Sequence, residues 1–356
     1  MSPHASPNRR TPARFSAPPA AILGAASILA ACPFALAQPD PSGIDFVTIG
    51  APGNPAYSGP DVNQTVTGRG SVPYEYRIGR TEVTTSQWME FYNAFYGRSP
   101  HISLPARWGA YQTGNPDQPF ALSNVPDSAL FPVSGVTWRT GALFCNWLHN
   151  DKSTDLSAIM NGAYDASTFG YDGQSRFTDQ QAHNPDARYW IPTIDEWIKA
   201  VYFDPNHGGQ GVPGWWYLAP NGSNTTLIYA PPEAGGQANA NFDLPINGQF
   251  RIPLMAYPDV ASPWGVLDAG GATREMLESI KVVDSIPYRR IIGSHWTSFS
   301  SSVDYIAQNG GVFPDTPSPF YGIRVAAAVP APGSCLVLAG AVGWSLRRRR
   351  VPCTHV

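Results

Sequence analysis

The chain has 356 residues and a formal net charge of −3, from 23 Lys and Arg against 26 Asp and Glu. Only 14% of the residues are charged, so the composition does not support the basic surface that nucleic-acid binding requires, and we expect no nucleic-acid partner. The 34 Gly and 36 Pro, with 12% aromatic residues, argue against a helix-rich protein and predict a loop-rich domain held together by aromatic packing.

The first 37 residues resemble a secretion signal. A basic region comes first, an apolar run follows from Ala20 to Ala31, and the small residues of Ala35-Leu36-Ala37 form a cleavage pattern. The apolar run is too short to span a membrane. An alternative is that Cys32, at the end of a lipoprotein-like box, is lipidated and anchors the protein. Both interpretations place the domain outside the cytoplasm.

Extended segments begin the body of the chain. Residues 38–45 include the stretch PDPSG, which is typical of a linker. The stretch FVTIG at residues 46–50 predicts a short strand. Residues 74–84 alternate roughly between apolar and polar side chains, as an extended segment does.

Three helices are predicted from capping chemistry and apolar spacing. Thr84 and Gln87 fit a capping box at the start of the first helix. The second begins at Trp138, where apolar residues recur at helical spacing. Thr193 and Glu196 form another capping box in the third, where acidic residues of the first turn also suit the helix dipole.

The second half of the body is less regular. Residues 203–259 are rich in Gly, Pro and Asn and predict an irregular excursion over the surface. An ordered turn is expected in residues 262–279, which contain the stretch DAGGATREMLES. The final strands are predicted in residues 289–299 and 320–327.

The C-terminus, residues 329–356, has three parts. A Pro-rich hinge contains Pro330 and Pro332, and an apolar segment runs from Cys335 to Leu346. This segment is short for a membrane span, but the basic block after it would hold it at the cytoplasmic face, so we expect transient membrane association. The basic block consists of Arg347, Arg348, Arg349 and Arg350.

This tail resembles a PEP-CTERM sorting signal, with Val-Pro-Ala-Pro in place of Pro-Glu-Pro. The resemblance implies recognition by an exosortase, removal of the tail and delivery to the cell surface or extracellular matrix. A plain membrane anchor is the alternative, and it also leaves the domain outside the cytoplasm.

Seven stretches between residues 46 and 328 resemble, in this order, the formylglycine-generating enzyme family, whose domains are also called sulfatase-modifying factor domains. With the tail, the chain looks like the secreted bacterial branch. The resemblance implies an α+β, C-type-lectin-like fold that is irregular and loop-rich, with few short helices and short antiparallel strands. The stretches are FVTIG, RIGRTEVTTSQWMEFYNA, PVSGVTWRTGALFCNWL, YWIPTIDEWIKAVYFDP, SPWGVLDAGGATREM, RRIIGSHW and YGIRVA.

The family's oxidases hold copper with two cysteines shortly before a final Gly-Phe-Arg-like motif. The corresponding stretch here, residues 291–324, contains no cysteine, and Cys145 is expected on the core face of an early helix. Because Cu(I) requires a pair of soft thiolates, we expect neither copper nor the oxidase activity. The iron-dependent branch needs a His-x-x-x-His-type cluster, and no two of the seven histidines have that spacing.

Calcium is the remaining metal that the resemblance implies. One family site surrounds a Gly-Asn-Val-Trp-Glu-Trp turn, which here reads GATREM, so Glu275 keeps the carboxylate among turn carbonyls. Arg274 replaces a tryptophan beside it, and an ion pair between Arg274 and Glu275 is the alternative. A second site maps to the loop near residue 241. The implied ligands are Glu275, Thr273, Gly271 and Gly270 at the first site and Asn241 and Phe242 at the second.

The candidate binding residues are His295, Trp296 and Asp304, in the region where the family forms its substrate groove. A lone histidine on a strand is more often structural. Arg324 is expected to make buried hydrogen bonds through its planar guanidinium. We predict a surface-delivered binding or scaffold module that is not an enzyme and that recognises an extracellular protein or glycan. The alternatives are an enzyme with unrecognised chemistry in the groove and a structural matrix component.

Two arrangements distinguish these functions. Convergence of His295, Glu275 and Asp304 with other polar groups in a deep pocket would favour the enzyme. A groove that is filled by aromatic rings, or is flat and open, would favour binding or structure.

Overall fold

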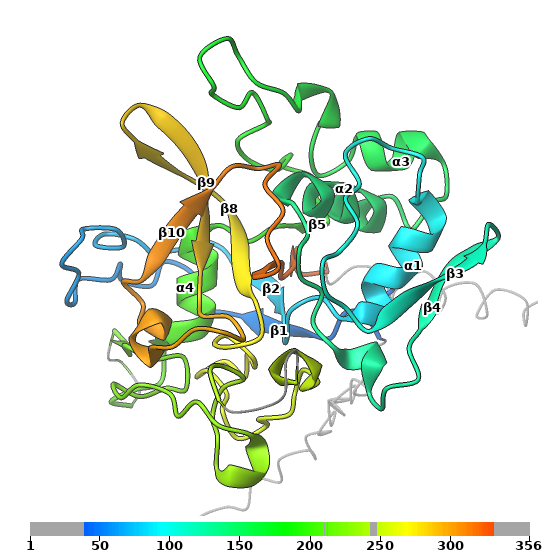
Figure 1. Cartoon of the computed structure of the whole chain (residues 1–356). Coiled ribbons are helices and arrows are strands. Elements are labelled where there is room, and N and C mark those ends of the chain that lie inside the picture. Colours follow the sequence, from blue (N-terminus) through cyan, green and yellow to red (C-terminus); the bar gives the residue numbers. More distant parts are fainter. Residues whose placement is uncertain (1–38, 210, 212, 243–247, 331–356) are drawn as a thin grey trace, which may run out of the picture. The chain divides into compact units, whose positions relative to one another are not determined.

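The structure, a computed structural model, describes residues 39–209, 211, 213–242 and 248–330 (Figure 1). The predicted secretion signal, Cys32 and all of the sorting tail beyond Pro330, including Pro332 and the four arginines, lie outside these ranges. Within them, no helix combines the length and apolar character that crossing a membrane requires.

Three of the four α-helices in the described residues begin where the sequence predicts, and the short helix at residues 156–160 is not part of the sequence prediction. Thr84 and Gln87 form a complete capping box before α1, and Thr193 and Glu196 form one before α4. In each box the side-chain oxygen and the backbone N–H groups satisfy one another, which fixes the start of the helix. The α-helices are α1 (Thr85–Phe95), α2 (Trp138–His149), α3 (Leu156–Met160) and α4 (Ile194–Tyr202).

The first sheet joins the two ends of the described chain. Its strand order is β1-β2-β12-β5, and every neighbouring pair is antiparallel. The late strand β12 therefore lies between β2 and β5, where it brings Arg324 close to the start of the domain. The strands are β1 (Phe46–Ile49), β2 (Tyr76–Gly79), β5 (Tyr189–Trp190) and β12 (Ala326–Ala327).

The second sheet carries the DAGGATREMLES stretch. Its order is β10-β9-β8-β11, with β11 parallel to β8 and the other pairs antiparallel. The yellow and gold hairpin of β8 and β9 extends beyond the sheet in Figure 1. The strands are β8 (Arg274–Val283), β9 (Ile286–Ile292), β10 (Asn309–Val312) and β11 (Tyr321–Gly322).

Two smaller hairpins complete the regular structure. The strands β3 and β4 pair beside α1, and the short strands β6 and β7 follow α4. Their bounds are β3 (Ala110–Asn115), β4 (Gln118–Leu122), β6 (Phe203–Asp204) and β7 (Trp215–Trp216). Together these elements confirm the α+β, irregular and loop-rich fold with short strands that the sequence predicts, with one parallel pair that it does not.

Aromatic rings form much of the core between α1 and α2. Phe91 of α1 packs against Phe144 and Trp147 of α2, with ring centroids 5.5 and 5.6 Å apart. Cys145 is fully buried and unpaired in the same helix, as expected. The composition therefore predicts the kind of packing as well as the scarcity of helices.

Two segments differ from the sequence predictions. The expected linker at residues 38–45 is packed on the domain from Pro39: Asp40 accepts a hydrogen bond from Arg77 at 2.7 Å, and Ile44 is buried. Residues 203–259 do not run only over the surface, because Ala240 and Leu254 are among their buried side chains. A Pro- and Gly-rich composition thus indicates irregular backbone but does not show whether it is buried.

Candidate functional site

Glu275 is buried in an ion pair with Arg324. The two residues are 1% and 0% exposed, and Arg324 binds the carboxylate with both Nε and Nη2, the shorter contact being 2.7 Å. Trp197 of α4 also donates to Oε2 at 2.6 Å. The alternative ion pair with Arg274 does not form, because neighbouring residues of a strand point to opposite faces. Arg324 takes that role instead.

The remaining donors of Arg324 confirm the expected buried hydrogen bonds. Its Nη1 donates to the carbonyl oxygens of Gly79 and Arg80, and its Nη2 donates to that of Leu267 at 3.0 Å. The guanidinium thus ties the second sheet to the end of β2 and to the loop before β8. This is the planar, multidentate binding for which arginine is suited.

A second buried carboxyl, Glu82, lies next to this pair and is not singled out by the sequence. Its Oε1 accepts the Thr273 N–H at 3.1 Å, while its Oε2 has no hydrogen-bond partner among the described residues. Burial, with the negative charge of Glu275 nearby, raises the pKa of Glu82 well above its usual value and favours its neutral form.

Gly271 and Asn241, two of the other implied calcium ligands, lie in close backbone packing. Gly271 adopts a φ of 84°, and a Cβ there would lie 2.6 Å from the backbone nitrogen of Asn239. Asn241 donates its N–H to the Trp296 carbonyl at 3.2 Å, and Phe242 ends its described segment. In the part of the chain that the structure describes, no three His, Cys, Asp or Glu side chains are grouped to hold a metal. The calcium that the resemblance implies at this turn is not tested by these contacts.

Thermal melts in EDTA and in added Ca²⁺ test that prediction. Calcium at Glu275 would have to displace Arg324 and Trp197 from the carboxylate oxygens. We therefore expect the same Tm in both conditions and no stoichiometric metal by elemental analysis. A Tm that rises with calcium would show that a site forms in spite of the ion pair.

Asp304 is directed into the protein. It is 1% exposed, and its oxygens accept hydrogen bonds from the Ser294 N–H at 2.9 Å and from the Tyr229 hydroxyl at 2.7 Å. Burial raises its pKa to about 6. Gly270 lies against it, since a Cβ there would be 2.9 Å from the carboxylate.

His295 and Trp296 pack on aromatic neighbours. The His295 ring stacks on Phe320 at 4.3 Å, and burial, with the charge of Arg274, lowers the pKa of this imidazole to about 4. It is therefore neutral at pH 7. Trp296 is 8% exposed and donates its indole N–H to the Pro319 carbonyl. Within the described ranges, the hydrogen bonds and stacking contacts of Glu275, Asp304 and His295 are made with different partners.

A cleft of about 340 Å³ borders this ring cluster. Phe131 and Phe250 pack with Trp296 and line the cleft, and the Arg107 guanidinium lies over the Trp296 ring at 4.8 Å. Arg107 and Arg251 are the charged residues of the lining, which includes no Asp or Glu. Sequence reasoning missed both arginines, because only the fold brings residues 107 and 251 to the same cleft.

The chain matches the family model of the sulfatase-modifying factor enzyme 1-like domain over residues 38–329. It belongs to this family. A search of the curated proteins finds no match.

Solved structures are similar to this sulfatase-modifying factor enzyme 1-like domain. CarF is 18% identical, and the alignment covers 81% of this chain and 100% of CarF with a TM-score of 0.52. Treponema denticola variable protein 1 is 17% identical over 80% of this chain and 95% of its own, with a TM-score of 0.48. PvdO from Pseudomonas aeruginosa is 13% identical over 80% and 92%, with a TM-score of 0.43. The likeness to CarF shows the fold alone.

The residues of this sulfatase-modifying factor enzyme 1-like domain do not fit the copper of the family's oxidases. The segment from Ile291 to Arg324 passes through His295 and Trp296 without a thiol. Cys145 lies in α2, where burial raises the pKa of its thiol well above the usual value and disfavours the thiolate. Residues 291–324 therefore provide no pair of soft thiolates that could hold Cu(I).

Proposed function

We propose that this protein is an exported, non-catalytic recognition module that binds an acidic partner in the cleft of Arg107 and Arg251. The observation that carries the proposal is the pair of guanidinium groups in a cleft whose lining has no carboxylate. The partner would be an extracellular protein or glycan that presents carboxylates.

The contacts of Glu275 and Asp304, in the region where the family forms its substrate groove, support a role without catalysis. Arg324 and Trp197 saturate Glu275, and Asp304 is bonded inward. A general base must reach a substrate proton, and neither carboxylate is accessible to do so. Trp296 and Phe320 fill the adjoining space with rings 5.9 Å apart, the arrangement that favours binding or structure over an enzyme.

The charge of the cleft supports an acidic partner. Neither Arg107 nor Arg251 forms an ion pair within the described ranges, and the buried Nε of Arg107 has no hydrogen-bond partner there. Guanidinium groups bind carboxylates with two parallel hydrogen bonds, and these are among the stronger polar contacts in proteins. The flanking rings of Trp108 and Phe250 would shield such contacts from water.

The termini support delivery outside the cell. The secretion-signal pattern of residues 1–37 and the PEP-CTERM-like tail of residues 329–356 are both export features in sequence. We propose that an exosortase removes the tail and that the domain then acts at the cell surface or in the extracellular matrix. Lipidation of Cys32 is the alternative anchor, and mass spectrometry of the mature protein distinguishes the two.

Titration with a hexaglutamate peptide tests the cleft. We expect binding that weakens as salt is added, and Arg251→Gln should weaken it about tenfold or more because a charge-assisted contact is lost. Hexaglutamine is the matched ligand control. Arg176→Gln is the matched protein control, since Arg176 is exposed and forms no ion pair within the described ranges. Equal effects of Arg251→Gln and Arg176→Gln would contradict the cleft assignment.

The absence of catalysis has its own assay. The purified domain is incubated with Cu(I), oxygen, a thiol reductant that supplies the remaining two electrons, and a peptide carrying the sulfatase cysteine motif, and the peptide mass is followed. We expect no conversion of cysteine to formylglycine. Conversion that increases in proportion to protein concentration would contradict the non-catalytic part of the proposal. It would not affect the conclusion from the hexaglutamate titration of the cleft.

A further inference from the structure

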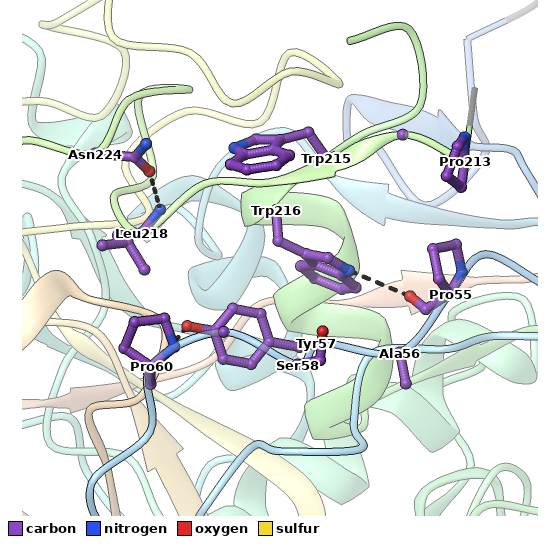
Figure 2. Close-up of a pocket in the computed structure, with 12 residues that line it drawn as sticks. Pro55, Ala56, Tyr57, Ser58, Pro60, Pro213, Trp215, Trp216, Leu218 and Asn224 are labelled. Atoms are coloured by element: carbon purple, nitrogen blue, oxygen red, sulfur yellow. Dashed lines mark hydrogen bonds between the residues drawn. The ribbon is translucent and has the colours of Figure 1, made fainter. Parts of the chain in front are cut away.

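A second cavity lies between the loop at residues 55–60 and the segment at residues 213–224 (Figure 2). We propose that it binds a neutral carbohydrate through the rings of Trp215 and Trp216, with the buried ring of Tyr57 packed behind Trp216. Its volume is about 450 Å³, within the range of about 300–1,000 Å³ for small-molecule sites. It shares no lining residue with the cleft of Arg107 and Arg251, which we call the arginine cleft, so the two proposals can be tested independently.

The aromatic wall of this cavity is fixed before any ligand arrives. Trp216 packs edge-on against Tyr57 with ring centroids 5.8 Å apart, and against Phe203 at 5.0 Å. Its indole N–H donates to the Pro55 carbonyl at 3.2 Å, as Figure 2 shows. Gly70 leaves room for this indole, because a Cβ there would lie 2.3 Å from it. A wall that is held this way loses little entropy on binding.

Trp215 is the exposed part of the cavity. The side chain is 48% exposed, and its described ring neighbour is His207, with centroids 5.5 Å apart. Trp215 and Trp216 follow each other in β7, so their indoles project from opposite sides of the strand, and both border the cavity (Figure 2). An indole face left open beside a cavity is suited to stack on a flat apolar surface of a ligand.

The polarity of the lining selects a neutral ligand with hydroxyl groups. No lining residue is charged, which disfavours an anion or a cation. Asn224 is exposed, and its Oδ1 accepts the Leu218 N–H at 3.1 Å while its amide nitrogen has no hydrogen-bond partner within the described ranges. Ser58 adds an exposed hydroxyl. A pyranose ring has an apolar C–H face for the indoles and hydroxyls that both donate and accept, so it matches this set.

A proline-rich peptide also binds aromatic grooves, but it fits these donors less well. Peptides in a polyproline conformation require N–H or O–H donors on the groove for their carbonyls. The indole N–H of Trp216 is bound to Pro55, and the Tyr57 hydroxyl donates to the Pro60 carbonyl at 2.9 Å. Two of the three aromatic donors are therefore occupied inside the protein.

Isothermal titration with neutral hexasaccharides tests the proposal. The probes are α- and β-linked glucose, mannose, galactose and N-acetylglucosamine hexasaccharides, and a proline decapeptide is the competing ligand. We expect at least one hexasaccharide to bind and Trp215→Ala to weaken it about tenfold or more. Trp215→Phe should restore most of the binding because it keeps a ring.

The control is Tyr111→Ala, which removes an aromatic residue of similar exposure (52%) from β3. The proposal is overturned if no hexasaccharide binds, if Trp215→Ala and Tyr111→Ala have equal effects, or if the decapeptide alone binds and depends on Trp215. Circular dichroism of each variant separates loss of binding from loss of folding. Hexaglutamate binding in the same samples reports on the arginine cleft, so failure of one site is distinguishable from failure of the other.

Discussion

Replacing Arg324 by methionine is expected to lower the free energy of unfolding by about 3–5 kcal/mol. The variant leaves the Glu275 carboxylate buried at 1% exposure with only the Trp197 indole as a donor. It also leaves several backbone carbonyls without their donor, since Arg324 serves Gly79 and Leu267 as well. Urea unfolding at pH 7 measures the loss.

The double variant Arg324→Met/Glu275→Met separates the ion pair from its surroundings. Replacing both members of a buried pair by apolar side chains is often neutral or stabilising, because both desolvation costs disappear. We therefore expect the double variant to recover most of the stability lost in Arg324→Met. A double variant as unstable as the single one would show that the backbone contacts of the guanidinium, not the pair, carry the effect.

An exposed ion pair provides the matched control. Lys152 and Glu90 are 2.6 Å apart, but their side chains are 23% and 54% exposed. Solvent screens such pairs, and Lys152→Met is expected to change stability by less than about 1 kcal/mol. A loss from Arg324→Met no larger than that from Lys152→Met would contradict the account of a buried pair.

Local signals in the sequence were sufficient to predict three of the four α-helices in the described residues. Both capping boxes act over three residues, and the Thr84 and Thr193 boxes form as predicted because nothing distant in the chain alters them. The same holds for Cys145, whose apolar neighbours in the helix already indicated burial. Predictions of where a helix starts and which of its faces is buried were therefore reliable, because they depend on residues within a few positions of one another.

Contacts between residues that are far apart in the chain could not be predicted from local signals. Adjacency in sequence suggested Arg274 as the partner of Glu275, but strand alternation separates them and the fold brings Arg324 from 49 residues away. The pairing of β8 with β9 was not predicted from the sequence. The turn between these strands places Asp284 and Ser285 at positive φ, and it contains no glycine that would have indicated a hairpin. Only the three-dimensional structure supplies both pairings.

The candidate binding surfaces illustrate the same limit. Arg107 and Arg251 meet in one cleft, and Tyr57 meets Trp216 in another, although each pair is separated by more than a hundred residues. No motif links such residues, because their relation depends on how loops cross the core. The sequence predicted the family and its missing cysteines, and the structure was needed to find what surface remains for recognition.

Asp304→Asn is expected to change how stability depends on pH. The folded-state pKa of Asp304 is raised to about 6 from 3.8, so the folded protein binds the proton more tightly than the unfolded chain. Its contribution to stability is fully present below about pH 4 and is lost as pH rises through about 6. Relative to the wild type, the free energy of unfolding of the variant should therefore be about 2 kcal/mol more favourable at pH 7 than at pH 4.

His295→Gln in the same loop should show the opposite sign. Burial lowers the pKa of His295 to about 4 from 6.5, so its contribution is present above about pH 6.5 and is lost as pH falls through about 4. Arg274 faces both groups: its charge lowers the pKa of Asp304 and of His295, and it is retained in both variants. Urea unfolding at pH 4, 5, 6 and 7 measures the two trends. Variants with the same trend would contradict the burial assigned to one of the two side chains.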